Sequence, residues 1–477
     1  MSDRRHNTGM RRGRSLLLAL AAQLALAAQL ALACGALGFA SGALAADARV
    51  ITYEEAVRIG LERNSDLRQA EIAARVGSVA VDQARARFLP DLSLSTRGGK
   101  SFGRSFDESE GRVIDTSTDT ASVGVSSSLP LFEGFANVAG LREAKLNEQA
   151  VHMDLTRTRE TVVFTVASNF LSLVQQQEEL RVRRESLAAQ AELERQISSY
   201  VDAGARTIAD LYQQQASVAA ARLAVVEAER AVQLAEVDLI QTLQLDPAGS
   251  YQFEPVPYDA VAAASDVPGL EAMLETAYAR RTDLRAEEQR TAATAEGIRI
   301  AKSTRWPSVS LSTGYSTSYT SASDFDVLDQ FDQRRGGSVS LGVSLPIFNR
   351  GSTRAAVRRA ELEADSAQIA LETARQEVGL EVRRAYQDLR AAREQLSSAD
   401  AQVKAADLAL QAAEDRYHAG AATLVELTQA RASQVQAASA LVSARSNLLF
   451  QRTLVDYFTG ALDPSGPSSA DRSAGEP

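Results

Sequence analysis

The sequence of 477 residues has almost none of the side chains that build disulfides and most catalytic sites. It contains one cysteine, Cys34, and three histidines, His6, His152 and His418. If the first 45 residues are removed on export, Cys34 is lost and the mature protein has no thiol, which excludes disulfides, zinc–thiolate sites and cysteine nucleophiles. No Gly-rich phosphate loop follows a strand-like segment. We therefore expect no catalytic residues, no metal site and no cofactor, and we expect that the protein is not an enzyme.

Long apolar runs are also missing once the first residues are set aside. Residues 1–45 hold an Arg-rich start, an apolar run from 16 to 33 and the small residues Ala43-Leu44-Ala45. That order is typical of a secretory signal peptide cleaved after Ala45. The alternative is that Cys34 accepts a lipid anchor, although Ala31-Leu32-Ala33 before it match that motif poorly. No later stretch is long enough for a membrane-spanning helix.

The remaining chain has fewer basic than acidic residues. Loss of residues 1–45 would remove five Arg and one Asp and change the formal net charge from -10 to -14. Nucleic-acid-binding proteins usually carry a basic surface. We therefore expect no nucleic-acid partner for this acidic, exported chain.

One pattern occurs twice, in residues 46–247 and 270–464. The segment from Asn64 to Arg68 recurs from Arg281 to Arg285, and both copies close on Leu-Asp-Pro, at 245–247 and 462–464. Because the period is far longer than a solenoid unit, it indicates an internal tandem duplication of one module. Residues 248–269 would then form a linker, equatorial if the helices form a tube, and 465–477 a flexible C-terminal tail.

Each copy contains long segments whose composition favours helix. Residues 141–200 have no Gly or Pro and are rich in Ala, Leu, Gln, Glu and Arg. Apolar residues recur every seven positions in both copies: Val166, Leu173, Leu180 and Leu187, then Val382, Leu389, Leu396 and Val403. The turns at Gly204 and Gly420 predict helix ends, each followed by a returning helix. Two antiparallel coiled-coil hairpins are expected, at about 136–245 and 352–460.

Each copy also contains two segments with strand-like alternation. Strands are predicted at about 91–104, 118–130, 308–320 and 337–347, with Val, Leu and Tyr on one face and Ser and Gly on the other. Their lengths suit tilted strands that cross a membrane. Four prolines are expected at helix–strand boundaries, where a missing N–H does least harm: Pro90, Pro130, Pro307 and Pro346.

A sheet of four strands cannot lie in lipid alone, because its two edges would expose unpaired N–H and C=O groups. Other copies of the chain must close it. Three copies would give a trimeric, 12-stranded transmembrane β-barrel, and their hairpins would continue it as an α-helical barrel. The fold class expected is therefore an α+β membrane protein built by tandem duplication.

In this order and twice over, these features resemble the TolC-type outer-membrane efflux proteins, the outer membrane factor family. The resemblance rests on the two hairpins, on Leu-Pro-Leu-Phe-Glu-Gly at 129–134 and Leu-Pro-Ile-Phe-Asn-Arg-Gly at 345–351, and on the Gly-x-x-Thr turns. It implies a homotrimer in the bacterial outer membrane that extends into the periplasm. Such a trimer is the passive exit duct of a tripartite efflux pump or a type I secretion system. The implied partners are outer-membrane lipid, a periplasmic adaptor (membrane fusion) protein and an inner-membrane pump of the RND, ABC or MFS type.

The resemblance also implies a site at the periplasmic tip. The tip turns, expected to contact the adaptor, contain Gly204, Thr207, Gly420 and Thr423. Matching the family positions that hold the aperture closed gives Asp210, Glu426 and Tyr417, with Arg206 nearby, and an Asp210–Tyr417 link as the expected latch. The chain departs from the family pattern at Gln429, Ala422 and Ala209, which puts a second latch in doubt.

Two other classes remain as alternatives: an exported structural coiled-coil protein of the cell envelope, and a periplasmic adaptor without channel activity. Neither needs strands lined with Ser on one face. Drug efflux, metal efflux and protein secretion would all use such a duct.

Overall fold

The computed structural model describes residues 49–107, 111–254, 268–323 and 325–463. The expected signal peptide with Cys34, most of the linker and the C-terminal tail lie outside the described residues. The chain divides into a small unit, which holds residues 248–253 and the chain up to Ile51, and a large unit with the remaining residues. Each unit is described by itself below.

The small unit contains two short strands. Strand β1 (Arg49–Ile51) pairs in parallel with β4 (Tyr251–Phe253), in the register Arg49↔Tyr251 to Ile51↔Phe253. β4 thus lies at the start of the segment expected to be a linker. Three residues are too few to show an alternating pattern, so the sequence did not predict either strand.

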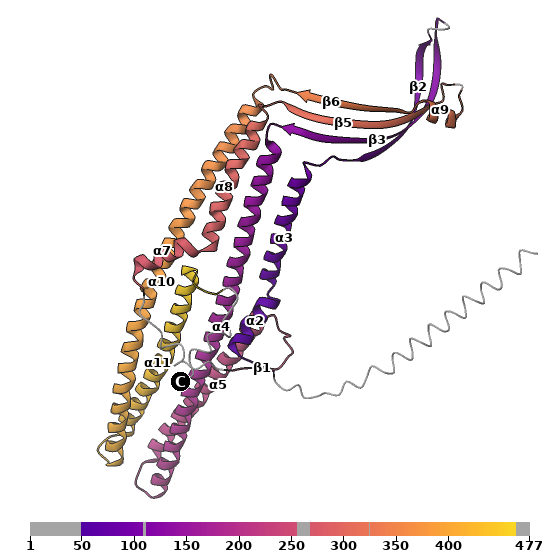
Figure 1. Ribbon diagram of the computed structural model, residues 1–477. Coiled ribbons are helices and arrows are strands. Elements are labelled where there is room, and N and C mark those ends of the chain that lie inside the picture. Colours follow the sequence, from indigo (N-terminus) through magenta and orange to yellow (C-terminus); the bar gives the residue numbers. More distant parts are fainter. Residues whose placement is uncertain (1–48, 108–110, 255–267, 324, 464–477) are drawn as a thin grey trace, which may run out of the picture. The chain divides into compact units, whose positions relative to one another are not determined.

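Two helices of 67 residues dominate the large unit: α4 (Ala136–Asp202) and α10 (Ser352–His418). At 1.5 Å per residue each is about 100 Å long. Figure 1 shows shorter helices beside them: α3 (Ser65–Ala86), α5 (Ile208–Thr242), α8 (Thr282–Ser303) and α11 (Leu424–Thr459). Helix α4 packs against all four, and α10 packs against α8 and α11.

The shorter helices meet end to end beside the long ones. Gln244, just after α5, donates from Nε2 to Ser65 Oγ at 3.0 Å, and its Oε1 accepts from Arg68 Nη2 at 3.4 Å, which ties α5 to the start of α3. Likewise, Gly460 at the end of α11 lies against the Arg280 and Arg281 backbone at the start of α8. Two pseudo-continuous helices therefore run beside two continuous ones.

The helix contacts bury the first two heptad positions that the sequence singled out in each copy, and they leave Leu180, Leu187, Leu396 and Val403 partly exposed. Val166, Leu173, Val382 and Leu389 are 0–3% exposed. One core cluster joins the second-copy residues Val382 and Leu389 to Met273 and Ala277 of α7 (Leu270–Arg280). Because the core residues are mostly Ala, Val and Leu, these layers of helices pack closely with few aromatic rings.

The helices α2 (Tyr53–Arg63) and α7 precede α3 and α8 with a one-residue break, and the two copies make that break differently. In the first copy Asn64 caps α3, its Oδ1 accepting from Asp66 N and Leu67 N. The equivalent residue in the second copy, Arg281, makes no side-chain cap and forms ion pairs instead.

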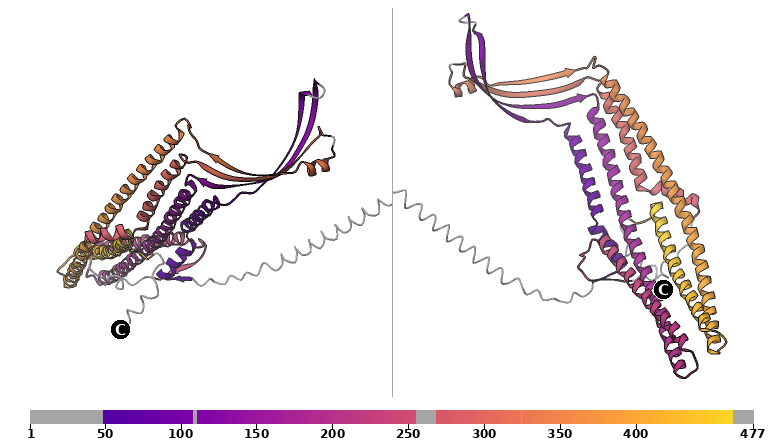
Figure 2. Two further views of the ribbon diagram at one scale, coloured as in Figure 1. Left: turned by 45° about the horizontal axis from the view of Figure 1, so that its top comes forward. Right: turned by 180° about the vertical axis from the view of Figure 1, so that it is seen from behind.

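The four predicted strands form one antiparallel sheet in the order β2-β3-β5-β6. They are β2 (Ser93–Asp107), β3 (Arg112–Glu133), β5 (Ser308–Thr320) and β6 (Gly336–Ser344). Both views in Figure 2 show the strands side by side as a curved sheet that leaves the helices at one end. Strands β2 and β6 are its edges.

The loop between β5 and β6 contains a short helix, α9 (Val327–Gln333), which the sequence did not predict. Its Gln330 is 1% exposed, and Gln330 Oε1 accepts from Thr320 N at 3.0 Å. The Thr317 hydroxyl donates to Phe331 O at 2.6 Å. The helix thus satisfies polar groups of β5 beyond the point where β6 stops pairing with it.

Three prolines lie between helix and strand as expected, and one does not. Pro90, Pro307 and Pro346 fall outside the strands, but β3 continues through Pro130 to Glu133. The boundary expected at Pro130 is therefore wrong. The β3–β5 register shifts between Pro130 and Phe132, so the residue between them bulges out of the ladder, and a bulge is a place where a strand tolerates proline.

Within the described residues, no helix is both long enough and apolar enough to cross a membrane.

Candidate functional site

The two hairpin turns are built alike. Gly204 and Gly420 have φ of +72° and +71°, a conformation that favours glycine, and each ends a 67-residue helix. Thr207 caps α5 and Thr423 caps α11, their hydroxyls accepting from the N–H of Asp210 and Glu426 at 3.3 Å. The expected tip residues of both copies therefore have defined helix-capping roles.

The Asp210 carboxylate is used within its own turn. Its Oδ2 accepts from Thr207 N at 3.3 Å and from Thr207 Oγ1 at 3.0 Å, so the two residues form a capping box. Glu426 likewise accepts from Thr423 Oγ1, at 3.5 Å, and it also pairs with Arg416, with 3.2 Å between Oε2 and Nη2. Both acids, which the sequence assigned to the aperture, are held by local partners in the isolated protomer.

Tyr417 is not bonded to Asp210. The ring is 2% exposed, and the hydroxyl has no hydrogen-bond partner. Burial raises the pKa of this hydroxyl; the charge of Arg206 acts against that rise, and Asp210 and Tyr200 add to it. The predicted Asp210–Tyr417 latch is therefore wrong for a single protomer, because the helix cap holds the carboxylate and the core holds the phenol.

Arg206 makes the contact that the sequence assigned to Asp210. Its guanidinium carbon lies 4.4 Å from the centre of the Tyr417 ring, and Nη2 is 3.5 Å from Tyr417 O. Beside this pair, one apolar cluster includes Leu193 and Ile197 of α4 together with Leu424 and Leu427 of α11. We name Arg206, Tyr417 and this cluster the tip clamp, because they join the first hairpin to the second.

A second polar joint ties the helices together farther from the tip. Arg157 of α4 donates to Glu160 Oε2 at 2.9 Å and to Tyr457 O at 3.0 Å, and its guanidinium lies 3.9 Å from the Tyr457 ring centre. Its Nε is 3.6 Å from Asp283 Oδ2 of α8. Arg157 thereby contacts both helices that meet end to end beside α4.

Arg281 completes this joint. It is 5% exposed and pairs with Asp283 at 2.5 Å and with Glu381 of α10. Sequence reasoning missed Arg157 and Arg281, although the exchange of Asn64 for Arg281 between equivalent positions was a visible signal. We call the side chains of Arg157, Glu160, Arg281, Asp283 and Glu381 the ionic joint.

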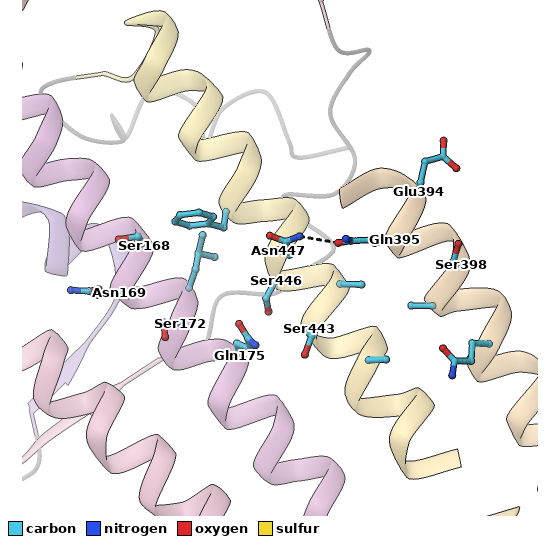
Figure 3. A pocket seen from close by; sticks show the side chains of 16 residues that line it. Ser168, Asn169, Ser172, Gln175, Glu394, Gln395, Ser398, Ser443, Ser446 and Asn447 are labelled. Carbon is cyan, nitrogen blue, oxygen red and sulfur yellow. Dashed lines mark hydrogen bonds between the residues drawn. The ribbon is translucent and has the colours of Figure 1, made fainter. Parts of the chain in front are cut away.

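An open groove lies between α4 and α10, over α11 (Figure 3). Its volume is about 1030 Å³, and its lining is mostly Ser, Asn and Gln with the single carboxylate Glu394. Asn447 Nδ2 donates to Gln395 Oε1 at 3.1 Å across it. None of the lining residues is a histidine or cysteine. Among the described residues, no group of three or more His, Cys, Asp or Glu is placed to hold a metal ion.

The sheet has two chemically different faces, and the register aligns them across all four strands. Leu129, Leu311 and Leu341 are consecutive partners on one face, and Ser128, Ser312 and Ser340 are consecutive partners on the other. Apolar side chains of the first face are exposed, including Leu94, Val125, Tyr315, Val339, Leu341 and Val343. An exposed apolar face of this size on a sheet with open edges marks an interaction surface.

The bulge at Pro130 keeps this division of faces to the end of β3. Beyond it, Phe132 pairs with Val309 and Glu133 with Ser308. If Leu131 were paired in the ladder instead of bulging out of it, strict alternation would place Phe132 on the hydroxyl face and Glu133 on the apolar face. The bulge therefore continues the apolar surface up to the helices.

Comparisons with known proteins agree with this architecture. The family model described as "Outer membrane efflux protein" matches residues 57–243 and 273–457. Protein CyaE of Bordetella pertussis is 30% identical over 390 residues, which cover 80% of this chain and 78% of that protein. The pyoverdine export outer membrane protein OpmQ of Pseudomonas putida is 24% identical over 393 residues, 80% of each chain.

A shorter match, 35% identical over 105 residues, is to the alkaline protease secretion protein AprF of Pseudomonas aeruginosa, and it covers 22% of this chain and 21% of that protein. Among solved structures, the CmeC outer membrane channel of Campylobacter jejuni has a TM-score of 0.74 at 18% identity, with 88% of each chain covered. The two family segments coincide with the two copies of the repeat, and the fold is that of outer-membrane channels. The chain belongs to the outer membrane efflux protein family.

Proposed function

We propose that three copies of this chain assemble into a channel that crosses the outer membrane and continues into the periplasm as a helical tube. One observation carries the proposal: the four-stranded sheet has two unpaired edges, one apolar face and one face of small hydroxyl and glycine residues. Pairing β6 of one copy with β2 of the next satisfies both edges. It also gives a closed barrel whose apolar face meets lipid and whose hydroxyl face lines water.

The helices supply the periplasmic part of the duct. The sheet and the hairpin turns lie at opposite ends of α4 and α10, so the tip clamp lies about 100 Å of helix away from the strands. In this proposal the tip clamp holds the two hairpins of a protomer together and keeps the tube narrow. Opening requires that the hairpins move apart, and a periplasmic adaptor and an inner-membrane pump provide the free energy for that movement.

The duct itself performs no chemistry and moves cargo that a pump delivers. Proteins similar to this chain are named for pyoverdine export and for alkaline protease secretion, which supports a duct that serves more than one kind of export system. We propose the same role here, as the exit duct of an efflux pump or of a type I secretion system.

The test is to purify the full-length protein from outer membranes in detergent and to measure its mass by native mass spectrometry and its conductance in planar bilayers. We expect a trimer and discrete single-channel currents of low conductance. A monomeric mass, or a trimer that passes no current at any voltage, would reject the duct and favour a structural envelope protein.

A further inference from the structure

The hydroxyl face of the sheet is nearly free of charge. Where β5 pairs with β3, this face carries Ser93, Ser95, Arg97 and Gly99 of β2; Thr120, Ser122, Gly124, Ser126, Ser128, Pro130 and Glu133 of β3; even-numbered residues 308–320 of β5; and even-numbered residues 336–344 of β6. The members from β5 and β6 are all Ser, Thr or Gly. Two charged residues remain on this part of the face, Arg97 and Glu133.

Arg97 lies level with the end of β5 that is far from the helices, and the β2–β3 ladder continues beyond it to Asp107. It pairs in register with Ser122, which pairs with Ser318 of β5. Its side chain is exposed, and no carboxylate among the described residues forms an ion pair with it. Its neighbours in the register are therefore hydroxyl groups, which leave its positive charge uncompensated.

Lys100, three residues later, provides the contrast. It lies on the opposite, apolar face and pairs in register with Asp119, with 3.4 Å between Nζ and Oδ1. The chain therefore neutralises a cation on the face that meets lipid and leaves one unneutralised on the face that meets water.

Glu133 does not neutralise Arg97 either. The cross-strand partner of Arg97 is Ser122, and Glu133 is eleven positions farther along β3, which is about 35 Å at the usual rise of a strand. The Debye length at physiological ionic strength is about 8 Å. The two charges thus act independently, and Glu133 lies at the end of the sheet next to the helices.

We propose that Arg97 sets the charge preference of the duct's outer section, favouring passage and transient binding of anionic groups. This inference rests on the proposed function, since it requires the sheet to be closed by other copies. In a trimer the three Arg97 side chains form one ring of guanidinium groups on an otherwise neutral, hydroxyl-lined wall. Rings of Arg or Lys favour anions in pores, and guanidinium binds carboxylates and phosphates with paired hydrogen bonds.

The ring of Arg97 side chains would favour cargo that carries negatively charged groups. Groups that would be held briefly at the ring are carboxylates, as on acidic polypeptides and carboxylate-bearing small molecules. A cation would meet no negatively charged side chain on the described part of this wall between Glu133 and Arg97.

The experiment measures block of single-channel current in planar bilayers by tripolyphosphate, a compact multivalent anion. It is added to one side at a time, because an anion that enters from the strand end reaches Arg97 before it meets the acids of the tip. Tripolyphosphate should block the wild-type channel only when it is added to the side on which the strands lie. Arg97→Gln should raise the half-blocking concentration at least about tenfold, whereas Arg97→Lys should raise it less than about threefold. The matched control Lys100→Gln, on the opposite face, should change it less than about twofold.

Equal block of the wild type and Arg97→Gln, or an equal change with Lys100→Gln, would overturn the proposal. The trimer mass of each variant is checked first, so that a loss of assembly is not mistaken for a loss of binding. If the wild type conducts no current, the proposed function fails and this inference fails with it. If the wild type conducts and Arg97 makes no difference, only this inference fails.

Discussion

At the scale of single residues, a hydrogen bond within one turn of the tip prevents Asp210 from bonding to a distant residue, Tyr417. Asp210 is three residues from Thr207, and the capping box between them forms as soon as α5 does. Tyr417 is then left to the apolar cluster, with Arg206 over its ring. Beside that cluster, the hairpins are joined by this cation–π pair, which is worth about 0.5–2 kcal/mol depending on its exposure.

Two substitutions distinguish the cation–π contact of the tip clamp from a hydrogen-bonded latch. Tyr417→Phe removes a buried hydroxyl that has no partner, so it should leave the closed-state conductance unchanged and the stability equal or higher. Arg206→Gln removes the cation and should increase the open probability about two- to thirtyfold, which corresponds to 0.5–2 kcal/mol. Single-channel recording measures both effects.

The control for this pair is Arg195→Gln, which alters a side chain of α4 that is 76% exposed and pairs with Glu192 in the preceding turn. Its conductance should equal that of the wild type. If Tyr417→Phe opened the channel as much as Arg206→Gln, the hydroxyl would have a partner in the trimer and the latch would be restored as an explanation.

At the scale of secondary-structure elements, the ionic joint holds four helices where two of them meet end to end. Burial raises the pKa of Glu160 even though Arg157 acts in the other direction. Burial also opposes ionisation of Asp283, but its hydrogen bond to Arg281 and the charges of Arg281 and Arg157 outweigh burial and lower its pKa. The contributions of these two neighbouring carboxylates to stability therefore change with pH in opposite directions.

The sign of each effect follows from proton linkage. Glu160 binds its proton more tightly in the folded state, so its contribution to stability is complete below its ordinary pKa and is lost as the pH rises through the folded value. Asp283 binds its proton less tightly when folded. Its contribution is complete above its ordinary pKa and is lost as the pH falls through the folded value.

We predict that the stability lost on Glu160→Gln grows as the pH is lowered from 7 to 4, and that the stability lost on Asp283→Asn shrinks over the same range and below it. Thermal unfolding followed by circular dichroism in detergent gives both series, with differences of a few °C in Tm expected. If the stability lost on substitution changed with pH in the same direction for both variants, the surroundings of the ionic joint in the trimer would differ from those in the protomer.

The sequence predicted those elements whose signal is local. The strand at 308–320 is visible because its side chains alternate without interruption, and the long helices are visible because they contain almost no breaker. What it missed depends on contacts between distant residues. Arg206 and Tyr417 are 211 residues apart, and no periodic pattern in the sequence predicts that they are in contact. Pro130 was misplaced because a bulge requires knowledge of the partner strand, β5.

At the scale of the whole molecule, the sheet must present one face to lipid and the other to water. Adjacent residues of β6 test this division, because Leu341 lies on the apolar face and Ser340 on the hydroxyl face. A basic residue facing lipid near the membrane centre costs about 2–4 kcal/mol, whereas the lumen of a barrel tolerates charge.

Leu341→Arg should therefore strongly reduce the fraction of protein recovered in the outer membrane as a trimer, and Ser340→Arg should leave that fraction near the wild-type level. Membrane fractionation followed by native electrophoresis measures it. Equal recovery of the two variants would show that the faces are not divided between lipid and water as we propose.

The bulge beside Pro130 also makes the chain tolerant of one change in length. Because Leu131 is the extra residue of the bulge, its deletion would place Phe132 directly after Pro130 and leave Phe132 opposite Val309 and Glu133 opposite Ser308. Deletion of Ser127, within the regular ladder, would instead exchange the faces of all β3 residues on one side of it, moving hydroxyl groups toward lipid and apolar side chains into water. Homologous outer-membrane ducts should therefore tolerate the loss of the residue at 131 while conserving, without gaps, the length of the regular part of β3.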